Sequence, residues 1–317
     1  MSRPPRVLFL APDTEDYLAD SLLHGLRLVL GDHCVDWPKR DVLYETFPTE
    51  HRGALYGRGF TLYSGLLEDI EIDRVQALRR AQLGEFDLVV VGDVWRHWGW
   101  WSQLRGRVPK LAVLDGSDYP WPFPWSTQFL RHPAMWPRLP RRSRKVAYFK
   151  RELVRGRHMH PIAFSIPEQH VVATPPEKHE LFGRHVVDPE VAARVGAATG
   201  YAFASQEEYF ADLRAARFGI TTKREGWDAM RHYEIAAAGA VPCVRDLARK
   251  PGSCAPHGLR DGVNCVAYTS AETLLSRVEA MPAVEYDRLQ AGALAWARAN
   301  TTRTRAQEFL SVLNVPA

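Results

Sequence analysis

Charged side chains that suit a phosphorylated ligand gather in one short stretch of the carboxyl half. Lys223 and Arg224 lie in a polar loop, and Arg231 and Glu234 follow in a segment with a helical pattern. Cations near a helix N-terminus bind phosphate oxygens, and a carboxylate can accept hydrogen bonds from ribose hydroxyls. The set therefore predicts a site for a nucleotide diphosphate. The alternative is an ordinary surface ion pair on one helix face, although a cation that precedes the acid is the less favourable order.

The elements around these residues form a strand–loop–helix–strand unit. The apolar run Phe218–Ile220 predicts the end of a buried strand, and Ala240–Val244 predicts the next strand. Between them we expect a helix with Asp228 as its N-cap and Gly239 just beyond its last turn. Ligands of open α/β sheets bind beyond the carboxyl ends of the strands, so the charged loop lies where a ligand would bind.

The segment RHYEIAAAGAVPCVRDL, which starts at Arg231, resembles the donor-binding motif of the group 1 glycosyltransferases, a two-domain GT-B superfamily. Downstream, Pro256–Cys265 resembles the Gly-x-Asn turn of those enzymes, and Tyr268–Leu274 resembles the strand end and helix start that follow it. The form Arg-x-x-Glu-x-x-Ala-x-Gly is closest to the sporulation-protein-like and exostosin-like subgroups. The resemblance extends over residues 203–300.

This resemblance implies an α/β fold of two Rossmann-like domains (GT-B) that face each other across a cleft. It assigns residues 1–165 to an acceptor domain and residues 166–317 to a nucleotide-sugar donor domain. The implied activity is hexosyltransferase-like transfer of a sugar from a nucleotide-sugar to an unidentified acceptor. In this resemblance Glu234 binds the ribose hydroxyls, and Arg231 contacts the phosphates or orients Glu234. The spacing from Glu225 to Glu234 is one residue longer than in the superfamily, so Glu225 receives no role.

The departure of a diphosphate requires positive charge near its oxygens, because neutralising their charge lowers the barrier. We expect Lys223, Arg224 and Arg231 to supply that charge. The chain contains no Asp-x-Asp triplet, so we predict a metal-independent reaction. No cofactor is expected, since the nucleotide-sugar is a substrate. A solvated turn is the alternative for the two loop cations.

Polar residues also follow the predicted strands of the amino half. Asp13 follows the first strand, His97 follows the strand that ends at Val91, and Asp115 follows the strand that ends at Leu114. The carboxyl ends of parallel strands meet at one edge of a sheet, where an acceptor and a base would lie. Asp13 and Asp115 are therefore our catalytic candidates. The alternatives are a helix or turn cap for Asp13 and an exposed loop position for His97.

Apolar runs alternate with helical patterns along the chain, which is typical of parallel sheets with helices on both faces. The other predicted strands are Arg6–Ala11, Val35–Trp37, Phe86–Val91, Val108–Leu114, Lys145–Phe149, Pro161–Ile166, Val171–Thr174 and Cys265–Tyr268. The other predicted helices are Tyr17–Leu30, Asp73–Gln82, Asp188–Thr199, Ser205–Ala216, Ala271–Ala280, Tyr286–Asn300 and Thr302–Leu313. Residues 39–60 are expected to form a long loop, and residues 162–170 to contain the domain boundary.

Aromatic residues are concentrated in the amino half. Trp95, Trp98, Trp100 and Trp101 form a cluster, and Tyr119–Trp125 alternates aromatic residues with proline. We interpret the cluster as core or loop packing and the second segment as a rigid lid or rim. Stacking of these rings on a pyranose is the alternative.

The composition indicates a globular protein. The 317 residues are 46% hydrophobic and 25% charged, and the chain is long enough for two α/β domains. No apolar run approaches the roughly 18 residues of a membrane span, and the first residues do not resemble a signal peptide. The four cysteines lack Cys-x-x-Cys spacing, so we predict reduced thiols in a cytoplasmic protein.

The segment 131–158 is strongly basic, with ten Lys or Arg residues against one acid. We interpret it as a solvated rim beside a nucleotide site. A peripheral membrane contact or an acidic acceptor is the alternative. The chain carries no nucleic-acid-binding motif, so no nucleic-acid partner is expected.

Two other functions stay open at this stage. A non-catalytic nucleotide-sugar-binding protein would need no catalytic base, and a nucleotide-sugar epimerase would need no acceptor. Hydrolysis of the donor and product analysis without an acceptor would separate these functions from transfer.

Overall fold

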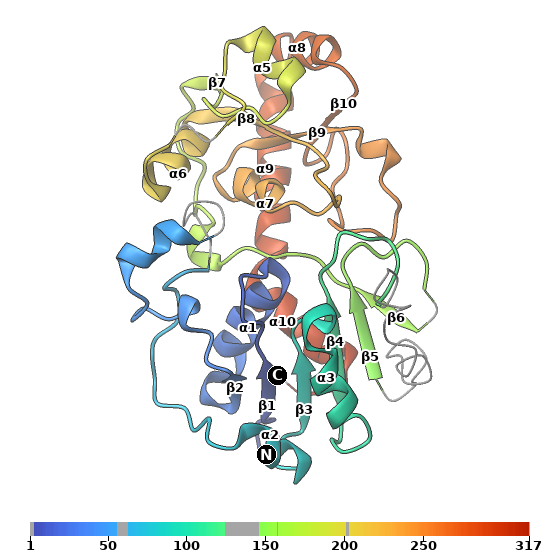
Figure 1. Ribbon diagram of the computed structural model, residues 1–317. Helices are drawn as coiled ribbons and strands as arrows, with labels where there is room; N and C mark the ends of the chain where they lie inside the picture. Colours follow the sequence, from blue (N-terminus) through green and yellow to red (C-terminus); the bar gives the residue numbers. More distant parts are fainter. Residues whose placement is uncertain (1–2, 56–62, 124–145, 157, 201–202, 317) are drawn as a thin grey trace. The chain divides into compact units, whose positions relative to one another are not determined.

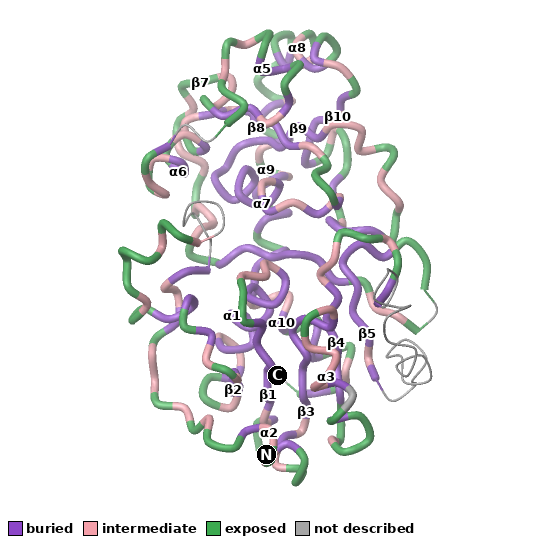
Figure 2. Tube along the Cα trace, viewed as in Figure 1, coloured by how far each residue is buried: buried purple, intermediate pink, exposed green. Residues whose placement is uncertain are grey.

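The computed structural model describes residues 3–55, 63–123, 146–156, 158–200 and 203–316. The chain divides into two compact units. The amino-terminal unit contains residues 1–164 and 302–317, and the carboxyl-terminal unit contains residues 165–301. Each unit has a parallel sheet whose strands are largely buried (Figures 1 and 2).

The sheet of the amino-terminal unit has the order β2-β1-β3-β4-β5-β6, with all pairs parallel. Its strands are β1 (Val7–Leu10), β2 (Cys34–Trp37), β3 (Leu88–Val91), β4 (Leu111–Asp115), β5 (Val146–Lys150) and β6 (Met159–Pro161). Its helices are α1 (Tyr17–Leu30), α2 (Ala77–Gln82), α3 (Val94–Leu104) and α10 (Thr302–Val312). Because β1 pairs with β2 on one side and with β3 on the other, the strand order reverses at β1. Ligands of open α/β sheets bind at such a switch point.

Alternate strand residues pack on one face of this sheet against α2 and α3. The cluster includes Leu8 and Leu10 of β1, Val89 and Val91 of β3, and Trp101 of α3. Side chains of a strand alternate between the two faces, so this spacing of two indicates one common face. The continuous apolar runs in the sequence reflect burial of both faces.

The last helix, α10, packs against α1. A Cβ atom at Gly25 would lie 2.0 Å from the backbone carbonyl oxygen of Thr302, so the two helices can approach this closely only because residue 25 is glycine. His24 Nδ1 lies 2.8 Å from Thr302 Oγ1. The assignment of residues 166–317 to the second domain is therefore wrong for residues 302–317, which belong with the amino-terminal unit. Helical periodicity defines an apolar face but does not say which sheet that face covers.

The sheet of the carboxyl-terminal unit has the order β10-β9-β8-β7, again all parallel. Its strands are β7 (Glu180–Phe182), β8 (Ala216–Thr221), β9 (Val241–Arg245) and β10 (Val266–Tyr268). Its helices are α5 (Pro189–Val195), α6 (Gln206–Ala215), α7 (Met230–Ala237), α8 (Ala271–Glu279) and α9 (Ala283–Ala299). The 3-10 turns are Gly31–His33, Asp41–Leu43 and Thr49–Ala54 in the amino-terminal unit, and Glu168–His170 and Leu247–Arg249 in the carboxyl-terminal unit.

Several predicted elements differ from the structure. Residues 171–174 form no strand, and of Pro161–Ile166 only Pro161 belongs to one, β6. The prediction missed β7, a three-residue edge strand with an exposed Glu180, because so short a strand leaves no apolar run. It also missed α3, which begins where Asp93 accepts hydrogen bonds from the N–H groups of Trp95 and Arg96. No helix in the described ranges has both the length and the apolar character that crossing a lipid bilayer requires.

Candidate functional site

The loop between β8 and α7 is fastened by one histidine. His232 Nε2 donates to the carbonyl of Trp227 at 2.9 Å, so its Nδ1 accepts from the hydroxyl of Thr221, also at 2.9 Å. The two ends of residues 222–227 are thereby tied to the same helix. This loop carries the predicted cations Lys223 and Arg224.

The predicted N-cap is wrong. Helix α7 begins at Met230, and its N-cap position is Ala229, whose side chain forms no capping hydrogen bond. Asp228 instead accepts a hydrogen bond from the hydroxyl of Tyr233 at 2.8 Å and is buried. Gly239 has φ +71° just past the last helical turn, as the sequence predicts.

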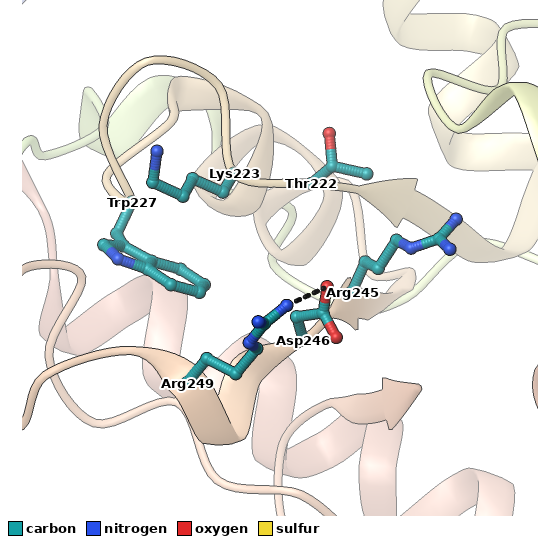
Figure 3. A pocket seen from close by; sticks show the side chains of 6 residues that line it. All are labelled: Thr222, Lys223, Trp227, Arg245, Asp246 and Arg249. Atoms are coloured by element: carbon teal, nitrogen blue, oxygen red, sulfur yellow. Dashed lines mark ion pairs between the residues drawn. The ribbon is translucent and has the colours of Figure 1, made fainter. Parts of the chain in front are cut away.

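A small cavity of about 260 Å³ lies beyond the carboxyl ends of β8 and β9 (Figure 3). Its lining residues are Thr222, Lys223, Trp227, Arg245, Asp246 and Arg249. Figure 3 shows the indole ring of Trp227 on one side and the guanidinium of Arg249 on another. The cavity therefore combines an aromatic face with cationic groups at the strand ends, where a ligand of such a sheet binds.

The cations of this cavity differ in how much of their charge is already compensated. Arg245 forms ion pairs with Asp188 at 2.7 Å and with Glu190 at 2.9 Å. Arg249 is 77% exposed, and its ion pair with Asp246 is longer, at 3.7 Å. Lys223 Nζ donates to the carbonyl of Glu225 at 2.7 Å. Arg249 and Lys223 thus keep more capacity for an anion than Arg245 does.

Arg224 lies in the same loop but does not line the cavity. Its backbone N–H donates to the carbonyl of Gly226 at 3.0 Å, and the residue is exposed. Of the four predicted donor-binding residues, Lys223 alone lines this cavity.

Glu234 and Arg231 are joined by a third residue that the sequence did not indicate. The hydroxyl of Tyr209, in α6, donates to Glu234 Oε2 at 2.5 Å and accepts from Arg231 Nη1 at 3.0 Å. Within the described ranges no ion pair joins Arg231 directly to Glu234. The surface ion pair that was the alternative interpretation therefore does not form.

The guanidinium of Arg231 is occupied mainly by the protein itself. Its Nε donates to the carbonyl of Ile220 at 2.9 Å, and its Nη2 donates to the carbonyl of His185 at 2.6 Å. These bonds tie α7 to the end of β8 and to the segment after β7. The geometry supports the expected orienting role, through Tyr209, and speaks against direct phosphate contact.

Glu234 is 8% exposed, and only one of its oxygens has a partner among the described residues. The other oxygen, Oε1, has no hydrogen-bond partner among the described residues. Burial raises the pKa of Glu234, and the hydroxyl of Tyr209 and the charge of Arg231 oppose that rise. Nearby, burial and the same arginine lower the pKa of His185 to about 4, so that imidazole is neutral at pH 7.

In the amino-terminal unit, Asp13 and His97 meet at the switch point of the sheet. Asp13 follows β1 and is 76% exposed, and its Oδ1 lies 3.9 Å from His97 Nε2. The ring of His97 stacks on that of Trp100, with the ring centroids 4.3 Å apart. Burial lowers the pKa of His97. His97 lies in α3, at a residue where φ −113° and ψ 27° interrupt the helix. The alternative interpretation of His97 as an exposed loop residue is wrong, and Asp13 is accessible to solvent.

Asp115 has no accessible oxygen. It is fully buried, and Lys150 Nζ, also fully buried, donates to its Oδ1 at 3.1 Å. Trp95 Nε1 and Ser117 Oγ donate to the same oxygen at 2.8 and 2.7 Å, and the Tyr148 hydroxyl donates to Oδ2. A carboxylate with both oxygens occupied by protein donors cannot receive a proton from a substrate in this conformation. The geometry therefore supports a structural role for Asp115 and speaks against a catalytic one.

Most of the basic segment 131–158 lies outside the described residues. Two described cations of this segment, Lys150 and Arg151, are buried. Lys150 pairs with Asp115, and Arg151 pairs with Asp118 and Glu152. These two residues are part of the core at the end of β5, so the interpretation as a solvated rim is wrong for them.

Sequence reasoning missed Tyr209, Trp227 and Arg249. Trp227 is an aromatic residue in a strand-to-helix loop beside Lys223, which was a usable signal. Arg249 follows the end of β9 by four residues, a position that strand-end reasoning could have reached. Tyr209 is 25 residues from Glu234, and nothing in the sequence connects the two.

No family model and no curated protein matches the chain. Solved structures do match over nearly its whole length. Anabaena Alr3699/HepE, in complex with UDP and glucose, has a TM-score of 0.58 at 10% identity, with 98% of this chain and 99% of that chain covered. A glycosyltransferase from Rickettsia africae ESF-5 has a TM-score of 0.52 at 10% identity, with 98% of each chain covered.

OtsA in its apo form has a TM-score of 0.51 at 11% identity, with 98% of this chain and 100% of that chain covered. At such low identity these similarities identify the fold. The chain has an α/β fold of two Rossmann-like domains, the GT-B architecture.

Proposed function

We propose that this protein is a metal-independent glycosyltransferase that transfers a sugar, in particular a hexose, from a nucleotide-sugar to an acceptor. The carboxyl-terminal unit binds the donor, and the amino-terminal unit binds the acceptor. The GT-B architecture supports this proposal, and one structure of that architecture, HepE, contains UDP and glucose. UDP-hexoses are therefore the first donors to test.

Glu234 is the observation that carries the proposal. A buried carboxylate with an unsatisfied oxygen costs free energy unless a partner arrives. Ribose hydroxyls are neutral donors that would satisfy Oε1, while Tyr209 and Arg231 hold the carboxylate in place. The acid thus fits the ribose role that the motif predicts.

The cavity lined by Lys223, Trp227 and Arg249 would hold the diphosphate end of the donor. Its volume of about 260 Å³ is below the roughly 300–1,000 Å³ of pockets that enclose a whole small molecule, so it would take part of the ligand. The rate advantage would come from positioning both substrates and from stabilising the departing diphosphate.

Asp13 is our candidate for the base that accepts the proton of the acceptor. It is exposed at the switch point of the amino-terminal sheet, beside a neutral His97. The occupied oxygens of Asp115 favour Asp13 over Asp115 in this role. They also favour, as a second candidate function, a non-catalytic nucleotide-sugar-binding protein. Transfer or hydrolysis of a bound UDP-hexose distinguishes the two. The subgroup and the cytoplasmic location stay predictions.

Calorimetry with UDP and a panel of nucleotide-sugars tests the donor site. We expect Glu234→Ala to weaken binding by about 10- to 100-fold, since hydrogen bonds to a charged group contribute about 1.5–3 kcal/mol. Glu279→Ala is the matched control, because Glu279 is an exposed glutamate of α8 in the same unit. Equal affinity in the Glu234 variant and the wild type would refute the donor site. Activity that survives chelation of metal ions is the test of metal independence.

A further inference from the structure

A loop with two exposed aromatic rings follows β4. Tyr119 is 59% exposed and Trp121 is 53% exposed, and each is followed by a proline that fixes its own φ angle. Tyrosine and tryptophan are enriched at interaction surfaces, because each combines a large apolar ring with a polar group. The described part of this loop, residues 116–123, has no role in the donor site.

The loop is held in one conformation by the buried Asp115. One oxygen of Asp115 accepts from the N–H of Ser117 at 3.2 Å, and the other accepts from the N–H of Phe123 at 3.2 Å. Lys150 Nζ donates to the carbonyl of Ser117 at 2.7 Å. Ser117 and Phe123, near the two ends of the described part of the loop, are therefore fastened to the same buried ion pair. A binding surface that is ordered beforehand loses little conformational entropy when a ligand arrives.

This loop belongs to the same edge of the sheet as the switch point. The ring of Tyr119 lies 6.1 Å from that of Trp95, which precedes His97 by two residues in α3. A Cβ atom at Gly116 would lie 3.4 Å from Asp16 Oδ1, at the start of α1. The loops after β1, β3 and β4 are thus in contact with one another. They bring the aromatic rings to the edge that carries Asp13.

We propose that this edge binds a neutral saccharide, which is the acceptor of the transfer reaction proposed above. A pyranose has an apolar C–H face and a rim of hydroxyls. Tyr119 and Trp121 offer ring faces for the first, and the exposed carboxylates of Asp13 and Asp118 accept hydrogen bonds from the second. Asp118 is 40% exposed and Asp13 is 76% exposed. Arg151 pairs with Asp118, so the exposed charge of Asp13 is what disfavours an anionic acceptor or an anionic membrane surface here.

The test uses the full chain and a panel of neutral di- and trisaccharides, first on an array and then by calorimetry. The wild type binds at least one saccharide in the panel. Trp121→Ala and Tyr119→Ala each weaken that binding by about tenfold, the change that a stacking contact of this kind supports. Trp121→Phe keeps most of the affinity because it keeps a ring. The affinity for UDP is the same in all four proteins, since none of these residues belongs to the donor site.

Three results overturn the inference. The first is the absence of saccharide binding at about 10 mM, where even weak sites fill. The second is saccharide binding that Trp121→Ala leaves unchanged. The third is binding to anionic vesicles that depends on Trp121. In each case UDP binding still reports on the donor site. Conversely, saccharide binding without any nucleotide binding refutes the proposed transferase and leaves the saccharide surface standing.

Discussion

Two buried carboxylates, Asp115 at the end of β4 and Glu234 within helix α7, have opposite surroundings. Asp115 is fully buried and receives protein donors on both oxygens, including the ammonium of Lys150. Glu234 is nearly as buried, but the hydroxyl of Tyr209 reaches only one of its oxygens. The sequence indicated a functional role for both acids.

The difference shows how to separate a structural acid from a binding acid. Removing a carboxylate from water is costly, and a buried cation with several hydrogen bonds compensates it. Asp115 has that compensation within the protein, and its capacity to accept hydrogen bonds is used to order a loop. Glu234 has less compensation, and burial raises its pKa. The second oxygen of Glu234 can therefore accept hydrogen bonds from a ligand.

The largest expected effect is the loss of stability when the buried ion pair of Asp115 and Lys150 is broken. Lys150→Met leaves Asp115 buried without its cation, so we expect a loss of about 3–5 kcal/mol in the free energy of unfolding. Urea unfolding followed by tryptophan fluorescence measures it, and Arg107→Met, at an exposed arginine of the same unit, is the control. A loss of less than about 1 kcal/mol, the range of a surface pair, would mean that the Asp115 network is not a closed structural unit.

Arg231→Met tests whether Arg231 is an anchor or a phosphate ligand. The variant leaves the carbonyls of Ile220 and His185 without their donor, so we expect a loss of about 2–3 kcal/mol in stability. UDP affinity falls as well, because Tyr209 no longer orients Glu234. Arg224→Met is the control for stability, since Arg224 is exposed. A large loss of UDP affinity at unchanged stability would restore the phosphate role that the motif predicts.

The pH dependence of donor binding tests the role of Glu234, the carboxylate with one unpaired oxygen. Because the pKa of Glu234 is raised, the wild type takes up a proton at a higher pH than an ordinary glutamate at about 4.3. Affinity for UDP-glucose should therefore fall by up to about tenfold as pH is lowered through that raised pKa. The same group makes folding less favourable as pH rises through it, since the unfolded chain ionises more readily. Calorimetry from acidic to neutral pH should give a flat profile for Glu234→Gln, and a sloping profile in that variant would assign the titration elsewhere.

The smallest expected effect concerns the cavity at the ends of β8 and β9. Lys223→Ala should weaken UDP-glucose binding by about two- to fivefold, because an exposed cation contributes little in water. The loss should shrink as salt is added, since mobile ions screen exposed charges. Arg194→Ala, an exposed arginine of α5, is the control. An effect equal to that of Glu234→Ala would place Lys223, rather than the acid, at the centre of donor binding.

Much of the secondary structure was predictable because the local pattern was strong. Helix α1 runs from Tyr17 to Leu30, as the leucine spacing and Gly31 predict. Helix α3 was missed because its tryptophans suggested packing or loops, whereas Asp93 fixes its start. Strand β7 was missed because an edge strand of three residues gains its stability from its neighbour rather than from its own sequence.

The site was predictable only in part. The position of Glu234 in a helix after a charged loop followed from the sequence. Its partner Tyr209 did not, because only the tertiary structure brings α6 next to α7. The same holds for Asp115, whose buried cation lies 35 residues away in β5.

Local sequence by itself determined most helices, most strands and the loops that join them, because capping residues and apolar periodicity act over a few residues. It also determined which charged groups stand near strand ends. Only the tertiary structure decided which of those groups are neutralised by neighbours from distant segments, and that α10 returns to the first sheet. The physical reason is that desolvation and hydrogen bonding depend on what surrounds a side chain in space, which the order of residues along the chain does not specify.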